Sequence, residues 1–147
     1  KDALLENNNS EVYEALGVSS FPHYVSRYLA NSLINIISFF LLFAAVSDKN
    51  YESMLETLMR KLKPDRLVLT HLYTSRALPM EAMEKAAHRV AEGCEVQSIP
   101  DVKTAYQTLV QEKRPEDTCF CVGSLYLIGE LEKKISRTGF DSTVRMV

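Results

Sequence analysis

Apolar residues along the chain form short runs without alternation, each followed by a stretch with helical spacing. The clearest run covers 118–122, is closed by Gly123 and Ser124, and leads into a stretch at 125–135 with apolar residues three and four positions apart. This order is typical of a strand buried on both faces of a parallel sheet, followed by a helix. The pattern predicts that Ser124 caps the helix, whose free N–H groups then point above the sheet edge. Because every such crossing needs a turn, a purely structural role for Gly123 and Ser124 remains an alternative.

The spacing also predicts which side of that last helix faces the core. We expect Leu125, Ile128 and Ile135 to share one face, with Leu127 and Leu131 beside it. A second stretch, over 51–62, has the cleanest amphipathic pattern in the chain. Its apolar residues fall at intervals of three and four and predict core packing: Tyr51, Met54, Leu55, Leu58, Met59 and Leu62.

The same alternation repeats about five times. The expected strands are 12–16, 39–46, 66–72, 94–99, 118–122 and, at an edge, 143–147. Helices are expected between them, and we expect Asp48 and Asp101 to act as N-caps because their carboxylates can accept first-turn N–H groups. Pro79 begins a further helix and Gly93 stops it.

Alternation of strands and helices with short turns predicts an α/β fold with a doubly wound, mostly parallel sheet of five or six strands and helices on both faces. We expect an N-terminal arm at 1–11 and a single domain over 12–147. Ligands of such sheets meet the turns after the strands' carboxyl ends. The candidate turns are 17–22, 47–50, 73–78 and 123–125.

Composition narrows the function classes. The 147 residues carry a net charge of −2, which gives no basic surface for nucleic acid or an anionic membrane. The uncharged stretch 28–46 is interrupted by Asn and Ser and is better explained as a helix followed by a strand than as a membrane span. Three cysteines without paired spacing to His favour reduced thiols in a cytoplasmic protein. Because the chain begins at Lys1, we expect a fragment or a trimmed chain.

Candidate chemistry lies at the expected turns. The chain has no glycine-rich phosphate loop, nucleophile motif or metal-ligand cluster. Arg76 stands on a strand-to-helix loop, where a guanidinium can clamp a carboxylate or phosphate, although a solvated arginine is the simpler alternative. Asp48 and Lys49 are either site residues or a cap and a surface charge. His23 and His71 stand near loops, and a functional or a structural role is open for each.

Four motifs in order then indicate a family. FAAVSDKN at 43–50, LVLT at 67–70, TSRALP at 74–79 and VGSLYLIGE at 122–130 resemble the C-terminal domain of the folylpolyglutamate synthase/dihydrofolate synthase family, in the Mur ligase superfamily. The family patterns are roughly FGALADKD, SPRALP and GSLYLVGE. The resemblance covers about residues 18–136 and implies a Rossmann-like Mur ligase C-terminal domain.

The resemblance implies an ATP-dependent amide ligase. In this family Mg-ATP phosphorylates the carboxylate of a dihydropteroate or of a folate, and the amine of glutamate attacks the acyl phosphate. The phosphate loop and the metal ligands lie in the larger N-terminal ATPase domain, over which the C-terminal domain closes. The resemblance therefore implies that this chain is inactive alone and binds neither ATP nor Mg²⁺ tightly without that partner.

Carried over residue by residue, Asp48 and Lys49 match the DKD turn, Arg76 matches the arginine of SPRA, and Ser124 matches the serine of GSLYL. In related Mur ligases the SPRA loop helps to hold the incoming amino acid. Ser75 replaces its proline.

The family's DGAHNP motif, whose Asp and His serve the nucleotide, aligns with GVSSFP at 17–22, where only Pro22 is kept. Either the nucleotide contacts come from elsewhere, with His23 adjacent, or the domain is a degenerate, non-catalytic binding module that kept the fold and lost the site.

Overall fold

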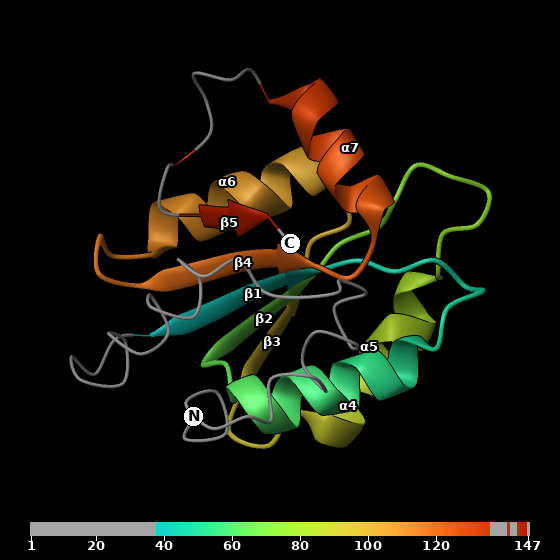
Figure 1. Ribbon diagram of the computed structural model, residues 1–147, viewed down its shortest axis with the longest axis horizontal. Helices are drawn as coiled ribbons and strands as arrows, with labels where there is room; N and C mark the ends of the chain where they lie inside the picture. Colours follow the sequence, from blue (N-terminus) through green and yellow to red (C-terminus); the bar gives the residue numbers. More distant parts are fainter. Residues whose placement is uncertain (1–37, 136–140, 142–143, 147) are drawn as a thin grey trace, which may run out of the picture.

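In the part of the chain that the structure describes, five parallel strands form one sheet with helices on both faces (Figure 1). The computed structural model describes residues 38–135, 141 and 144–146. In chain order the elements are β1 (Phe39–Phe43), α4 (Tyr51–Leu62), β2 (Arg66–Leu69), α5 (Met80–Val90), β3 (Glu95–Ser98), α6 (Val102–Glu112), β4 (Thr118–Val122), α7 (Leu125–Lys134) and β5 (Val144–Met146). The spatial order is β3-β2-β1-β4-β5, so the predicted doubly wound parallel sheet is confirmed.

The two central strands, β1 and β4, explain the apolar runs without alternation. All five residues of β4 are buried, and β1 pairs with β2 on one side and β4 on the other. The amino end of β1 is held by two carboxylates. Asp65 accepts the Phe39 N–H at 2.7 Å, and Asp117 accepts the Ser38 N–H at 3.2 Å. These bonds align β1 with the chain that enters β2 and β4.

Helices cover both faces of the sheet (Figure 1), and an apolar layer lies between the sheet and the helices on each face. One layer lies beneath α4 and α5, and the other beneath α6 and α7. Alternate residues of each central strand face opposite layers, as Leu41 and Leu42 of β1 do. The predicted apolar stripe of α4 supplies four fully or nearly buried residues: Leu55, Leu58, Met59 and Leu62.

The helix caps confirm part of the prediction. Asp101 caps α6 by accepting the Thr104 N–H at 2.9 Å, and Ser124 caps α7 by accepting the Tyr126 N–H at 3.2 Å. Asp48 was expected to cap α4, and this is wrong. Asn50 is the cap, with its side chain accepting the Ser53 N–H at 3.3 Å. The helix begins at Tyr51, where the apolar pattern starts, and Asp48 lies two residues before its cap.

The expected inward face of α7 is also partly wrong. Leu127, Leu131 and Ile135 are buried at four-residue intervals, whereas Leu125 is 83% exposed. Leu125 is exposed because it is the first residue of the helix, where the chain has just passed the sheet edge. Strand ends differ from prediction by up to three residues, and α5 ends at Val90 before the turn at Gly93.

Several predictions fall outside the described residues. These are the arm at 1–11, the strand at 12–16, the following turn and helix, and His23. Within residues 38–135, 141 and 144–146, no helix is long and apolar enough to cross a membrane.

Candidate functional site

The carboxyl edge of the sheet brings together three turns that are distant in sequence. They follow β1, β2 and β4 and lie on the right in Figure 1. After β1 the chain moves outward to β2 and β3, and it returns to the other side of β1 at β4. The junction between β1 and β4 is therefore the topological switch point, where open α/β sheets leave a crevice for ligands.

Gly123 makes the close approach at this junction possible. Its φ of 118° is rarely adopted by other residues. A Cβ at this position would collide with the carbonyl oxygen of Ala44 and lie 3.0 Å from the Phe43 ring. The turn after β4 is thus packed directly against the chain leaving β1, and only glycine fits there.

The loop after β2 is bound along one side to the segment after β1. The Arg76 carbonyl accepts from Ser47 twice, from its N–H at 2.8 Å and from its hydroxyl at 3.1 Å. Val46 and Ala77 form an antiparallel bridge, and the Leu78 N–H donates to the Ala45 carbonyl at 3.0 Å. These bonds fix the backbone at Arg76 next to the turn that carries Asp48.

The Arg76 guanidinium joins all three turns. One terminal nitrogen pairs with the Asp48 carboxylate, and the other donates to the Tyr126 hydroxyl at 3.1 Å. The guanidinium carbon also lies 5.7 Å from the centroid of the Tyr126 ring. The Arg76 and Asp48 side chains are 48% and 54% exposed, so the group remains open to a ligand or a partner.

Electrostatics follow from this pairing. The hydrogen bond from Arg76 lowers the pKa of Asp48, and the same bond raises the pKa of Arg76. Both groups are therefore charged at neutral pH. The arrangement can receive a carboxylate or phosphate on the unpaired edges of the guanidinium, while Asp48 limits the net positive charge.

The remaining predicted residues have different positions. Lys49 is exposed in the same turn as Asp48. Ser124 uses its hydroxyl to cap α7, so its shown role is structural. His71 lines a cavity of about 530 Å³ with Tyr73, Thr74 and others between the ends of β2 and β3. Asp48, Arg76 and the start of α7 are thus together, while His71 stands at the neighbouring strand end.

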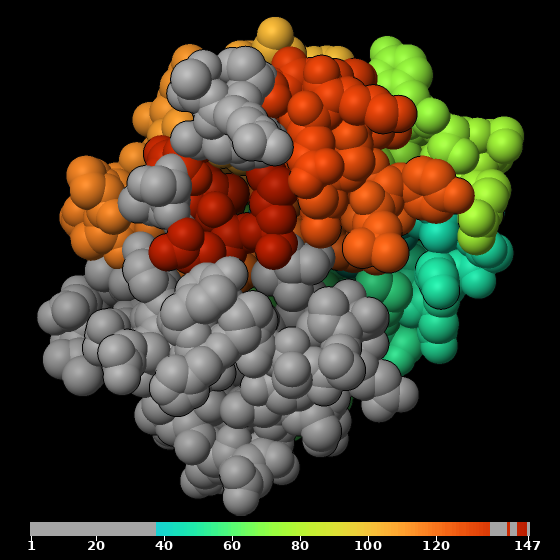
Figure 2. Space-filling view, turned by 45° about the horizontal axis from the view of Figure 1, so that its top comes forward, coloured from blue at the N-terminus to red at the C-terminus, as the bar shows by residue number. Residues whose placement is uncertain are grey.

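Sequence reasoning missed Tyr126 and Tyr73. In the part of the chain that the structure describes, the large apolar side chains classed as exposed are Tyr73 (77%), Leu125 (83%) and Tyr126 (44%). All three follow β2 or β4 at the carboxyl edge. Figure 2 shows the orange start of α7 projecting beside the yellow-green loop and the teal turn. The aromatic residue inside the GSLYL motif is the sequence signal that points to Tyr126.

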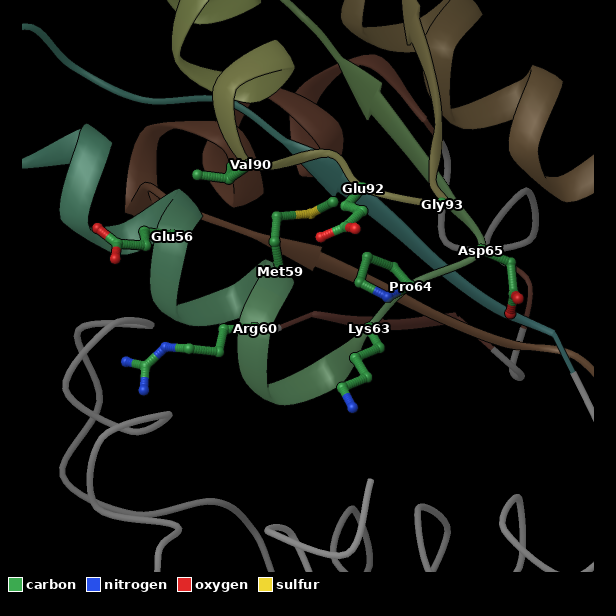
Figure 3. A pocket seen from close by; sticks show the side chains of 9 residues that line it. All are labelled: Glu56, Met59, Arg60, Lys63, Pro64, Asp65, Val90, Glu92 and Gly93. Carbon is green, nitrogen blue, oxygen red and sulfur yellow. The ribbon is translucent and has the colours of Figure 1, made fainter.

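A second cavity, of about 450 Å³, lies at the opposite edge (Figure 3). Met59 and Glu92 stand at its centre, and Arg60 and Lys63 extend to one side. It lies at the ends of α4 and α5, next to Asp65, which precedes β2. Because ligands of parallel sheets meet the carboxyl ends of the strands, this cavity is not the favoured site.

The described residues offer neither a metal-binding cluster nor a reactive thiol. No group of three or more His, Cys, Asp or Glu there is arranged to hold a metal ion. Burial raises the pKa of Cys94 to about 11 and that of Cys119 to about 12, and it raises the pKa of Cys121 well above its ordinary value. All three are free cysteines, and the raised pKa values make them poor nucleophiles.

Comparison with solved structures shows the fold. A bifunctional folylpolyglutamate synthase/dihydrofolate synthase from Yersinia pestis, solved with AMPPNP and a Mn ion, matches at a TM-score of 0.52 and 22% identity over 78% of this chain. The folylpolyglutamate synthases of Mycobacterium tuberculosis, solved with ADP and AMPPCP, and of Helicobacter pylori both match at a TM-score of 0.49, with 20% and 16% identity. They cover 76% and 74% of this chain.

The match is to part of each enzyme. The chain spans about a quarter of their length, 27%, 27% and 25% in the order given. It shares its fold with that part of the Yersinia pestis enzyme. No family model matches the sequence. No curated protein matches it either.

Proposed function

We propose that this chain is the C-terminal domain of an ATP-dependent amide ligase of the Mur ligase superfamily. The ligase adds glutamate to a folate or dihydropteroate through an acyl phosphate. The observation that carries the proposal is the joining of Asp48, Arg76 and the GSLYL turn at one sheet edge. These residues come from three motifs that resemble this family, and the fold matches part of such an enzyme.

The proposed role of the edge is to complete a site between two domains. The exposed Tyr73, Leu125 and Tyr126 give the apolar area that a partner domain would cover. The N-terminal ATPase domain of the same protein is the proposed partner. It supplies the phosphate loop, and the chain alone is inactive. The proposed location is the cytoplasm.

Each residue has a proposed task. Arg76 holds a carboxylate of the incoming glutamate, and Asp48 orients the guanidinium. Lys49 and His23 contribute to nucleotide or substrate contacts, and Ser124 sets the start of α7. Holding the amine near the acyl phosphate makes the attack effectively unimolecular, and phosphorylation supplies the leaving group.

Magnesium fits the partner better than this edge. Mg²⁺ favours carboxylates and phosphate oxygens, and the carboxylate in the turn after β1, Asp48, is already paired with Arg76. We therefore assign the Mg²⁺ ligands to ATP and the N-terminal domain, where the ion would neutralise phosphate charge.

A second candidate is a non-catalytic binding module. It is favoured by the GVSSFP sequence at 17–22, which keeps only one residue of the family's nucleotide motif. It is also favoured by the internal pairing of Arg76 with Asp48, which leaves less of the guanidinium for a ligand.

Calorimetry and an activity assay separate these functions. The 147-residue chain is titrated with Mg-ATP, Mg-ADP and glutamate to millimolar concentrations, and the full-length protein is assayed for ATP-dependent ligation of glutamate. We expect no tight binding by the chain and ligation by the full-length protein. Micromolar nucleotide binding by the chain alone contradicts an interdomain site. No ligation with either acceptor favours the binding module.

A further inference from the structure

One face of α7 carries three residues that all meet the loop after β2. Tyr126, Glu130 and Lys134 stand four residues apart, so they lie in one row along the helix. Their partners are Tyr73 and Arg76, which are 50 to 57 residues earlier in the sequence in the two hydrogen-bonded cases. The row therefore connects the GSLYLIGE motif to the TSRALP motif.

Each contact in the row is different. The Tyr126 hydroxyl accepts from the Arg76 guanidinium at 3.1 Å. The Glu130 carboxylate accepts the backbone N–H of Tyr73. The Lys134 ammonium lies 4.0 Å from the centroid of the Tyr73 ring and also 4.0 Å from the Asp101 carboxylate. Side chain, backbone and ring of the loop are thus all held by one helix.

The opposite side of the same loop is bound through its backbone to Ala45, Val46 and Ser47. On the amino side, the His71 N–H donates to the Pro100 carbonyl at 3.1 Å, so backbone bonds hold the loop on both sides of the segment from Tyr73 to Ser75. Glu130 adds an attachment within this segment, because it holds the N–H of Tyr73, three residues before Arg76.

The placement of one Glu130 carboxylate oxygen has a cost that stability alone does not explain. Its second carboxylate oxygen is buried and has no hydrogen-bond partner among the described residues. A buried carboxylate oxygen without a partner is unfavourable, and an apolar side chain would pack on α7 without that penalty. A carboxylate at this place is therefore better explained by the loop position that it fixes.

We infer that Glu130 is a positioning residue that fixes the loop from Tyr73 to Arg76 and so aims the Arg76 guanidinium at its ligand. Tyr126 completes the alignment by holding the guanidinium itself. This inference rests on the proposed function for the identity of the ligand, the carboxylate of glutamate. The fixing of the loop itself does not depend on that function.

The first measurement is hydrogen exchange at the Tyr73 amide, by NMR on the 147-residue chain. Glu130→Ala is expected to speed exchange about tenfold or more, because the acceptor is lost. Glu130→Gln keeps an oxygen acceptor and is expected to restore slow exchange. Glu132→Ala removes an exposed carboxylate from the same helix and serves as the matched control. Unchanged exchange in Glu130→Ala overturns the inference.

The second measurement is the KM for glutamate in the full-length protein. Glu130→Ala is expected to raise KM about tenfold with kcat changed less than about twofold, and Glu130→Gln to restore it. Adding Glu130→Ala to Arg76→Ala is expected to raise KM no further, since both remove the same contact. Additive effects, or a KM raised by Arg76→Ala but not by Glu130→Ala, overturn the inference. If Arg76→Ala alone leaves KM unchanged while exchange responds as expected, the proposed function fails and the loop-fixing role stands.

Discussion

The carboxylate of Asp48 pairs with the guanidinium of Arg76 across 28 residues of sequence. The pair connects the turn after β1 to the loop after β2 above the switch point of the sheet. Because both side chains are about half exposed, the pair contributes little to stability, as surface ion pairs generally do. Its consequence is geometric, since it sets the direction of the cation.

The titration of Asp48 tests this pairing. Because the folded pKa is lowered, the stabilising effect is present above the ordinary value of 3.8 and is lost as the pH falls through the folded pKa. We expect the carboxyl carbon of Asp48, followed by NMR, to titrate below 3.8, and Arg76→Ala to return it toward that value. Arg114→Ala, which removes the partner of Asp117, is the control. If the titration midpoint of Asp48 is the same with and without Arg76→Ala, the pair does not form in solution.

Gly123→Ala is expected to be strongly destabilising, by about 3 kcal/mol or more, because a positive φ and a backbone collision coincide. Gly129→Ala lies in α7 with nothing within 4 Å of the added Cβ, and is expected to stabilise by about 0.5–1 kcal/mol. Urea unfolding of both variants measures the difference. Equal midpoints would mean that the turn after β4 is not packed against Ala44.

Leu125→Ala and Leu127→Ala compare the truncation of an exposed and of a buried leucine on the same helix, α7. Leu127 is fully buried, so its truncation is expected to cost about 2–5 kcal/mol in the free energy of unfolding. Leu125 is 83% exposed, and its truncation is expected to change stability by less than about 0.5 kcal/mol. In the full-length protein, we expect Leu125→Ala to reduce activity without lowering the midpoint of unfolding. Full activity of Leu125→Ala would remove this residue from the domain contact.

Thiol labelling tests the environment of the cysteines. With its pKa raised to about 11, Cys94 is expected to react about a hundredfold more slowly at pH 8 than a free thiol. Cys119 and Cys121 are fully buried in β4 and are expected to react only when the chain unfolds. Mass spectrometry of the folded and urea-unfolded chain counts the labels. Rapid labelling of Cys121 in the folded chain would contradict its burial.

Much of the fold could be predicted because local signals and burial agree. The unalternating run of β4, the stripe of α4 and the caps Asp101 and Ser124 each have one simple explanation. The start of α4 is the exception, because Asp48 was predicted as its cap and Asn50 is the observed one. The tertiary contact with Arg76 decided this case, and no local pattern contains it.

The candidate site could be predicted only in part. Motif resemblance selected Asp48 and Arg76, but not the contact between them. The roles of Tyr126 and Glu130 could not be predicted from the sequence. Aromatic and glutamate residues are common in helices, and the partners of these two are 50 or more residues away in the chain. His23 lies outside the described residues, so its role stays a prediction.

The most direct test of the account is the KM for glutamate of the full-length protein carrying Arg76→Ala. The control is Arg89→Ala, which removes an exposed arginine on α5 that pairs with Glu52. A guanidinium that clamps a carboxylate is worth about 2–4 kcal/mol, so KM is expected to rise about thirtyfold or more in Arg76→Ala and to stay constant in Arg89→Ala. An unchanged KM in Arg76→Ala would contradict the central claim that this sheet edge binds the incoming amino acid.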